Sequence, residues 1–319
     1  MPPRNRKVLA GVTAEERRRE RKKVGKLRHQ IVTQSTELRY KDTFREFRKY
    51  HNLRTDFTIE APEDFDEMVG EYIEALWEGG APKSQANYTL AAIQYHRPQT
   101  KSHLPWSWRL VKAWNQVEIP QRATPMSPQM LLGYCGVALR WGHPVFAGLL
   151  QVGFSTFLRT GELLALTPLD VTLGRDSAVI FINASKGTKR KLLPLERVEV
   201  EDATALRALR VLMRRTRGRE TFWRGSRQEF LQLWHHVTQH LELQNLNLKP
   251  YSLPRGGATS AYRNGATLDA LLTKGRWQSA STARIYLDTG LQALVQLTLP
   301  APAHSRVTAG VRDFFKLSQ

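Results

Sequence analysis

Apolar side chains between residues 34 and 118 recur at the spacing of helices. The clearest run follows Pro62, where apolar residues fall on one face of a helix that Gly79 ends. No stretch in this part of the chain alternates between apolar and polar residues as a half-buried strand does. The pattern therefore predicts a small helical bundle, with its other helices near residues 43–50, 82–95 and 106–114.

A different pattern begins after residue 118. Residues 118–125 have the composition of a linker, and Ser127-Pro128 then caps the first of several helices that continue to about Leu166. Residues 178–182 and 191–195 are rich in strand-forming residues and flank a polar turn, which predicts a β-hairpin. Helical patterns return from about residue 201 to the end.

These patterns predict a fold class and a division of the chain. We expect a mainly α protein with a small β-hairpin or sheet (α+β). A basic tail over 1–33 precedes a helical domain over 34–118 and a larger domain over 122–319, and the length suits two domains.

The charge of the chain is far from balanced. Forty-eight Lys and Arg residues oppose 29 Asp and Glu residues, which gives a formal net charge of +19. Such a charge favours a polyanionic partner, because each phosphate contact releases condensed counterions. The alternative is a basic protein whose charge serves only to keep it soluble. The RRRERKK segment at 17–23 is typical of a nuclear-import patch or a phosphate-binding arm, and equally of a solvated extension.

Cysteine content and hydropathy favour a reducing, intracellular compartment. Cys135 is the single cysteine, so neither an internal disulfide nor a multi-cysteine zinc site is available. Residues 144–158 form the longest apolar run, but polar residues interrupt it, so we expect a buried helix there and no membrane span. The opening MPPRNRK lacks the apolar stretch of a secretory signal. The location would be nuclear in a eukaryote, and cytoplasmic or nucleoid-associated otherwise.

Four short segments of the second domain contain candidate reactive groups. Arg159 and Glu162 lie three residues apart in LRTGELLAL, a spacing that by itself is most often a surface ion pair. Lys186 lies in the polar turn SKGTKRK. A lysine in such a turn can reach a phosphate, but by itself it is more often only solvated. Arg255 precedes two glycines in SLPRGGAT, where small residues would let a DNA backbone approach. Tyr286 follows Trp277 by nine residues, a spacing that a core aromatic also explains.

The order and spacing of these segments resemble the tyrosine recombinase (phage integrase) superfamily, whose motif is Arg, Lys, His-x-x-Arg, His or Trp, then Tyr. Arg159, Lys186 and Arg255 stand where the family has its first arginine, its hairpin lysine and its second arginine. The Gly-Ala after Arg255 and the Trp277–Tyr286 step are similar to the Cre-like branch. The domain over 34–118 resembles the family's core-binding (SAM-like) domain in size, helix order and position.

One position departs from the family motif. The histidine expected three residues before Arg255 is Ser252, with Tyr251 before it and Pro254 after Leu253. A serine hydroxyl donates a hydrogen bond to phosphate but accepts protons poorly. This departure supports a competing hypothesis, in which the protein binds DNA and has lost cleavage.

The resemblance implies a site-specific recombinase or integrase that breaks and rejoins double-stranded DNA through a 3′-phosphotyrosine on Tyr286. Both arginines and Trp277 would donate to the phosphate oxygens, and Ser252 would occupy the histidine position. Lys186 would protonate the 5′ oxygen that leaves, and Glu162 would orient the neighbouring cations. A type IB topoisomerase shares this chemistry and remains an alternative.

The same resemblance implies which partners and cofactors to expect. Tyrosine recombinases act as tetramers assembled on DNA, so self-association is expected. The phosphotyrosine conserves the energy of the broken bond, so no ATP is needed, and the sequence offers no carboxylate cluster for Mg²⁺. His236 and His240 have a metal-binding spacing without the glutamate of a metalloprotease motif. We therefore expect no cofactor.

Overall fold

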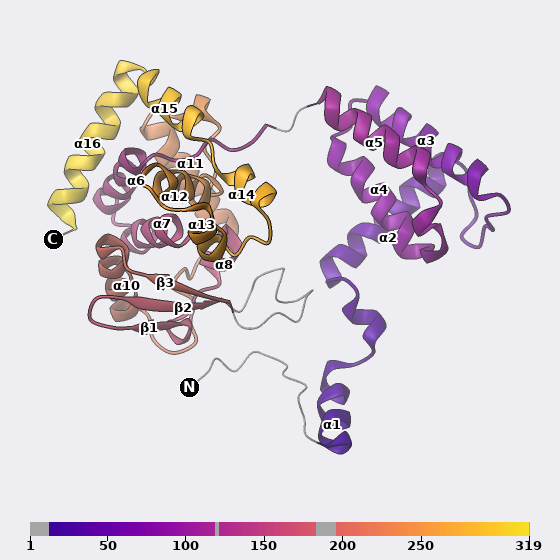
Figure 1. The fold of residues 1–319 in the computed structure, drawn as a ribbon, viewed down its shortest axis with the longest axis horizontal. Coiled ribbons are helices and arrows are strands. Elements are labelled where there is room, and N and C mark those ends of the chain that lie inside the picture. Colours follow the sequence, from indigo (N-terminus) through magenta and orange to yellow (C-terminus); the bar gives the residue numbers. More distant parts are fainter. Residues whose placement is uncertain (1–12, 119–120, 183–195, 319) are drawn as a thin grey trace. The chain divides into compact units, whose positions relative to one another are not determined.

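The computed structural model describes residues 13–118, 121–182 and 196–318. The chain divides into two compact units between Gln121 and Arg122, each drawn in Figure 1. The described residues are mostly helical with one small sheet, which confirms the expected fold class. No helix among them is long and apolar enough to span a bilayer.

The N-terminal unit is a helical bundle preceded by a basic helix. Helix α1 (Ala14–Val24) begins with a capping box between Thr13 and Glu16, and its described side chains are nearly all exposed. The bundle itself consists of α2 (Gln34–Tyr50), α3 (Pro62–Glu78), α4 (Lys83–His96) and α5 (Pro105–Val117).

Aromatic and aliphatic side chains form the core of this bundle. Phe47, Val69 and Leu90 are fully buried, and Phe47 packs edge-on against Tyr72 at 5.5 Å between ring centroids. The buried Asp66 joins α3 to α5, because its carboxylate accepts hydrogen bonds from the first backbone N–H groups of α5.

The C-terminal unit is built around two buried helices, α7 (Pro144–Thr156) and α12 (Ser252–Arg263). Figure 1 shows α12 in the middle of this unit, and α6, α7, α13, α14 and α15 pack against it. The other helices of the unit are α6 (Pro128–Arg140), α8 (Thr160–Leu164), α10 (Ala203–Arg215), α11 (Arg227–His240), α13 (Leu268–Gly275), α14 (Ala280–Tyr286), α15 (Thr289–Leu297) and α16 (Ala301–Leu317).

A three-stranded antiparallel sheet lies between α8 and α10 in the chain. Strands β1 (Val171–Leu173), β2 (Ala178–Ile182) and β3 (Glu196–Val200) pair in sequence order. The predicted strand at 178–182 is present as β2, and its described partners are β1 and β3, so the sheet extends beyond the expected hairpin. The predicted strand at 191–195 and Lys186 lie outside the described residues.

The two glycines after Arg255 serve internal packing, which corrects their expected use as an opening for DNA. A Cβ atom on Gly256 would come within 2.0 Å of the Met126 carbonyl oxygen, and one on Gly257 within 1.9 Å of the Phe154 carbonyl oxygen. Both residues lie inside α12, since the helix begins at Ser252, before Arg255. The glycines therefore let α12 approach the backbone of its own domain.

The last helix, α16, packs on α6 of the same chain. Val307 and Phe314 are buried in that contact. A side chain on Gly136 would clash with the Gly310 backbone, and one on Gly310 would clash with the Gly133 backbone. Phe315 stays 58% exposed on the outer side. One face of α16 is thus covered by its own chain, while Phe315 remains exposed.

Candidate active site

Arg159 is held by Glu162 at the start of α8. The Arg159 backbone N–H donates to Glu162 Oε2 at 3.0 Å, and its Nη1 donates to Glu162 Oε1 at 2.9 Å. Glu162 is 4% exposed, whereas the Arg159 side chain is 42% exposed. The buried carboxylate therefore fixes one edge of a guanidinium that still reaches solvent.

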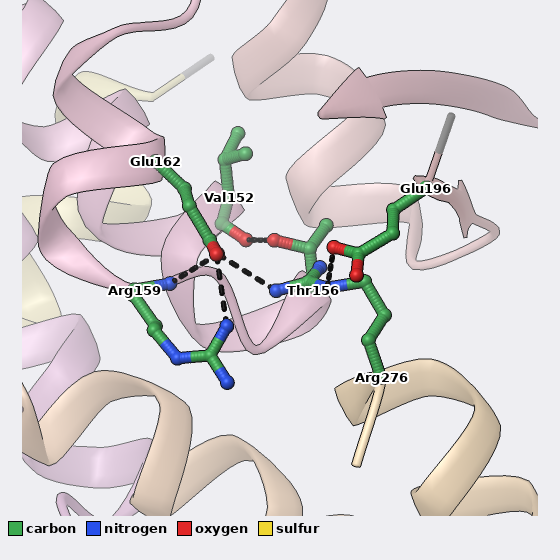
Figure 2. A network of polar contacts seen from close by, with 6 residues as sticks. All are labelled: Val152, Thr156, Arg159, Glu162, Glu196 and Arg276. Atoms are coloured by element: carbon green, nitrogen blue, oxygen red, sulfur yellow. Dashed lines mark hydrogen bonds and ion pairs between the residues drawn. The ribbon is translucent and has the colours of Figure 1, made fainter. Parts of the chain in front are cut away.

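A second arginine approaches the same carboxylate from α13. Arg276 ends that helix in the left-handed region (φ 57°), and its Nη2 donates to Glu162 Oε2 at 2.7 Å. Its Nε lies 3.4 Å from Glu196 Oε2, at the first residue of β3. Figure 2 shows Glu162 between the two guanidiniums and Glu196 on the far side of Arg276. Two glutamates and two arginines thus form one chain of charges, in which Glu162 and Arg276 are buried and Arg159 reaches solvent.

Arg255 is the most buried of the three arginines. Its side chain is 1% exposed in α12, and its nearest carboxylate is Asp288, at 3.7 Å from Nη2. Among the described residues, Nε and Nη1 of Arg255 have no hydrogen-bond partner. A buried guanidinium with unused donors is costly in the free protein and suited to an anion that supplies the missing acceptors.

Tyr286 ends α14 within a row of packed rings. Going outward from Phe157, the row contains Trp277, Tyr286 and Tyr251, with centroid separations of 6.2, 4.2 and 5.3 Å. Trp277 is 6% exposed and Tyr286 5%. We call these four residues the aromatic row. The Tyr286 backbone is also fixed, because Thr259 Oγ donates to its carbonyl at 3.2 Å.

Arg159, Arg255 and Arg276, which we call the guanidinium cluster, each interact electrostatically with Tyr286. Burial alone would lower the pKa of Arg159, but Glu162 and Tyr286 outweigh it and raise the pKa; a hydrogen bond to Tyr286 contributes. Burial lowers the pKa of Arg255 and of Arg276, and the nearby acids and Tyr286 oppose the shift. Helices α8, α12 and α13 thus each contribute a guanidinium that interacts electrostatically with Tyr286.

Ser252 occupies a different environment from the exposed part of the site. It is fully buried at the start of α12, and its Oγ accepts a hydrogen bond from the Lys249 backbone N–H at 3.1 Å. Its own carbonyl accepts from Met126 N–H. The hydroxyl is thus engaged in closing the turn before α12.

The structure therefore brings four of the sequence-predicted residues to one place, together with Glu162. These four residues are Arg159, Arg255, Trp277 and Tyr286. Ser252 is buried three residues before Arg255 in α12. Lys186 lies outside the described residues.

Two residues at the site were not predicted from the sequence. Arg276 has a left-handed backbone, which is uncommon for a non-glycine residue, but no pattern in the sequence indicates it. Tyr251 precedes Ser252 in the chain, and the family motif gives that position no role. Its partner Tyr286 is 35 residues away, so no local pattern links them.

The described residues offer no group of three or more His, Cys, Asp or Glu side chains arranged to hold a metal ion. Of the two histidines His236 and His240 in α11, His240 is hydrogen-bonded to an arginine: its Nε2 lies 2.8 Å from Arg140 Nη2.

Comparisons with known proteins identify the fold. No family model matches the sequence, and no curated protein matches it either. Among solved structures, the chain is similar to the Tn1549 transposon integrase (residues 82–397) in complex with circular intermediate DNA. The TM-score is 0.59 at 11% identity, with 84% of this chain and 94% of that chain covered.

A second similar structure is the XerH site-specific recombinase bound to palindromic difH substrate in a post-cleavage complex. The TM-score is 0.53 at 15% identity, with 80% of this chain and 78% of that chain covered. The chain has the tyrosine recombinase fold, as its motifs suggested. Its placement in the Cre-like branch stays a prediction.

Proposed function

We propose that this protein is a DNA strand transferase of the recombinase and integrase type, which breaks and rejoins double-stranded DNA with Tyr286 as the nucleophile. The observation that carries the proposal is that Tyr286 stacks on Trp277, with ring centroids 4.2 Å apart, and interacts electrostatically with three guanidiniums from α8, α12 and α13. A fold shared with a site-specific recombinase and a transposon integrase, both solved on DNA, supports it.

The proposed reaction combines these residues with the roles that the family resemblance implies. The Tyr286 hydroxyl loses its proton to solvent and its oxygen attacks the phosphorus. The P–O bond to Tyr286 forms, and the bond to the 5′ oxygen breaks. Negative charge grows on the non-bridging oxygens, where Arg159 and the unused donors of Arg255 supply hydrogen bonds. Trp277 adds its indole N–H, and Lys186 protonates the departing 5′ oxygen. A 5′ hydroxyl then attacks the phosphotyrosine and reverses these steps, which rejoins the DNA.

The charge of the molecule supports the choice of substrate. A net charge of +19 and a basic helix α1 favour binding along a phosphate backbone. Trp106 and Trp108 in the N-terminal unit are 45% and 43% exposed, so they are available for contacts, whereas Trp114 is buried. We further propose that the N-terminal unit is the core-binding domain and that protomers assemble as tetramers on DNA, without a cofactor.

Covalent trapping tests this function. A duplex is first selected from a random-sequence library with the Tyr286→Phe protein, so that selection depends on binding alone. The selected duplex is then synthesised with a nick moved one nucleotide at a time. The unchanged protein is expected to form a covalent adduct that survives denaturing electrophoresis, because a nicked strand loses its 5′ hydroxyl fragment and cannot be rejoined. Tyr286→Phe should bind the same DNA and give no adduct.

A second candidate function is DNA binding without cleavage. It is favoured by Ser252, whose buried hydroxyl closes a turn at the position where the family motif has histidine. Tight binding with no adduct at any nick position would establish this alternative. An adduct on Tyr286→Phe would instead reveal another nucleophile. Relaxation of supercoiled DNA without strand exchange between two duplexes would identify a topoisomerase.

A further inference from the structure

Gly275, Arg276 and Trp277 form the turn that ends α13. Arg276 has a left-handed backbone (φ 57°), and the backbone N–H groups of Arg276 and Trp277 donate to carbonyl groups in the last turn of α13, at 3.2 and 2.9 Å. The turn folds the Trp277 ring back over Gly275, where a Cβ atom would lie within 2.5 Å of that ring. The backbone of this short segment therefore decides where the Trp277 ring lies.

An arginine is an unusual residue for the left-handed position of this turn. Glycine adopts that conformation without strain, whereas the Cβ atom of any other residue is crowded by the neighbouring backbone. The turn alone would thus be more stable with glycine at position 276. Backbone strain of this kind is concentrated at functional sites, which points to a role for the Arg276 side chain.

The Arg276 side chain contacts two carboxylates (Figure 2). Its Nη2 donates to Glu162 Oε2 at 2.7 Å, and its Nε lies 3.4 Å from Glu196 Oε2. Arg255 differs from it, because the nearest carboxylate to Arg255 lies at 3.7 Å. The Arg276 side chain is also 6% exposed, against 42% for that of Arg159. The charge of Arg276 is therefore balanced within the protein, and Arg159 is the arginine of this network that a phosphate can reach.

Glu162 connects Arg276 to Arg159. The oxygen that accepts from Arg276, Oε2, also accepts from the Arg159 backbone N–H at 3.0 Å, and Oε1 accepts from Arg159 Nη1 at 2.9 Å. The two latter donors belong to Arg159 and move with it, whereas Arg276 comes from α13 and fixes the carboxylate relative to the rest of the domain. Arg276 also shares the negative charge of Glu162, so Glu162 does not cancel the charge that Arg159 offers to a phosphate.

We propose that Arg276 is a positioning residue for strand transfer: through Glu162 it holds the Arg159 guanidinium in the orientation that receives the DNA phosphate. The proposal rests on the proposed function, because it assigns Arg159 as a donor to that phosphate. The turn at Arg276 also places Trp277 on Tyr286, at 4.2 Å between ring centroids. One strained residue thus orients a cation and an aromatic ring of the same site.

Arg276→Gly tests the proposal in the full chain, because it removes the guanidinium and suits the left-handed turn. In single-turnover trapping on the nicked duplex, the rate of adduct formation should fall at least about tenfold, since a misplaced donor stabilises the developing charge less well. The affinity for the duplex, measured in the Tyr286→Phe background, should stay nearly unchanged. A purely structural role would instead lower the fraction of protein that binds and reacts, and leave the rate constant of that fraction as it was.

Combining variants shows whether Arg276 acts through Arg159. In Arg159→Ala protein, followed over days, Arg276→Gly should slow adduct formation far less than it does in the unchanged protein, because the residue that it positions is absent. The full loss in both backgrounds would show that Arg276 acts independently of Arg159, and would overturn the proposal.

A readout without DNA follows Arg159 directly. In protein with ¹⁵N-labelled arginine, a guanidinium held by a carboxylate rotates slowly about its Nε–Cζ bond, and Arg159→Lys assigns the Arg159 signals. Arg276→Gly should make the Arg159 guanidinium rotate severalfold faster, and an unchanged rotation rate would contradict the proposal. If the unchanged protein gives no adduct but Arg276→Gly frees this guanidinium, the positioning by Arg276 stands and strand transfer fails.

Glu242→Gly is the matched control. Glu242 is exposed, has a left-handed backbone too (φ 58°) and forms an ion pair with Arg306 at 2.9 Å, so its replacement makes the same change of backbone and removes an ion pair. Both readouts should stay unchanged. Arg276→Lys keeps a cation without the planar fork, so it should give intermediate values of both. If Arg276→Gly fails to fold, unchanged values in Arg276→Lys overturn the proposal.

Discussion

At the scale of single residues, the burial of Arg255 is expected to lower the stability of the free protein. Its guanidinium is almost fully buried, two of its nitrogens have no partner among the described residues, and its one carboxylate lies at 3.7 Å. Removing an ion from water costs several kcal/mol, which a single long ion pair does not offset. The arrangement is reasonable for a residue that receives a phosphate, because the missing acceptors arrive with the substrate.

Arg255→Met tests this interpretation. A methionine fills a similar volume without a charge, so the free energy of unfolding should stay equal or rise by about 1 kcal/mol. Adduct formation should fall by at least about 100-fold, because a donor at a developing charge is lost. Denaturant unfolding and single-turnover trapping measure the two effects. Arg263→Met, an exposed position in α12, is the control for both. A large loss of stability in Arg255→Met would contradict this interpretation, because it would show that the ion pair with Asp288 already compensates the buried charge of Arg255.

At the scale of elements, the chain of charges from Arg159 to Glu196 connects α8, α13 and β3. Glu162 accepts hydrogen bonds from Arg159 and Arg276, and Arg276 continues to Glu196 (Figure 2). Arg276 precedes Trp277, so the same short segment contributes to the charge network and the aromatic row. The position of Arg159 is thereby tied to the end of α13 and to the start of β3.

Arg276→Met should disturb both stability and function. It leaves Glu196 without its cation and Glu162 with only Arg159, so the free energy of unfolding should fall by about 3 kcal/mol. Adduct formation should also slow, because Arg159 loses part of its support. Adding Glu196→Gln removes the stranded carboxylate and should restore part of the stability, as measured by thermal unfolding. Arg284→Met in α14 is exposed and should change neither quantity. No rescue by Glu196→Gln would mean that the ion pair at 3.4 Å contributes little.

At the scale of the whole molecule, positive charge is the dominant property. The excess of 19 cations is distributed over a chain that forms two compact units, and part of it lies in the basic helix α1. Binding that neutralises several phosphates releases counterions, so its strength depends steeply on salt.

We therefore expect the affinity for duplex DNA to fall by about a thousandfold between about 50 and about 200 mM salt, as for roughly six phosphate contacts. Fluorescence anisotropy with a labelled duplex measures this dependence. The chain starting at residue 34 should show a shallower slope if the basic tail contacts phosphate, and the same slope if the tail is only solvated. An affinity that hardly changes with salt would argue against phosphate contacts as the basis of binding.

The sequence by itself determined the helices, the charge and the order of the motif. Helical periodicity, the prolines at helix starts and the caps are local signals, so they identified α3, α4, α5 and α6 closely. The spacing from Trp277 to Tyr286 is also local, since both lie around the short helix α14. Net charge needs no structure at all.

Only the tertiary structure decided which residues meet. Arg276 and Glu162 are 114 positions apart, and Tyr251 and Tyr286 are joined by no repeating pattern, so nothing in the sequence marks either contact. The glycines after Arg255 looked like an opening for DNA and proved to be the place where α12 touches the backbone of α7 and the segment before α6. Close packing between distant segments sets these relations, and local sequence does not encode it.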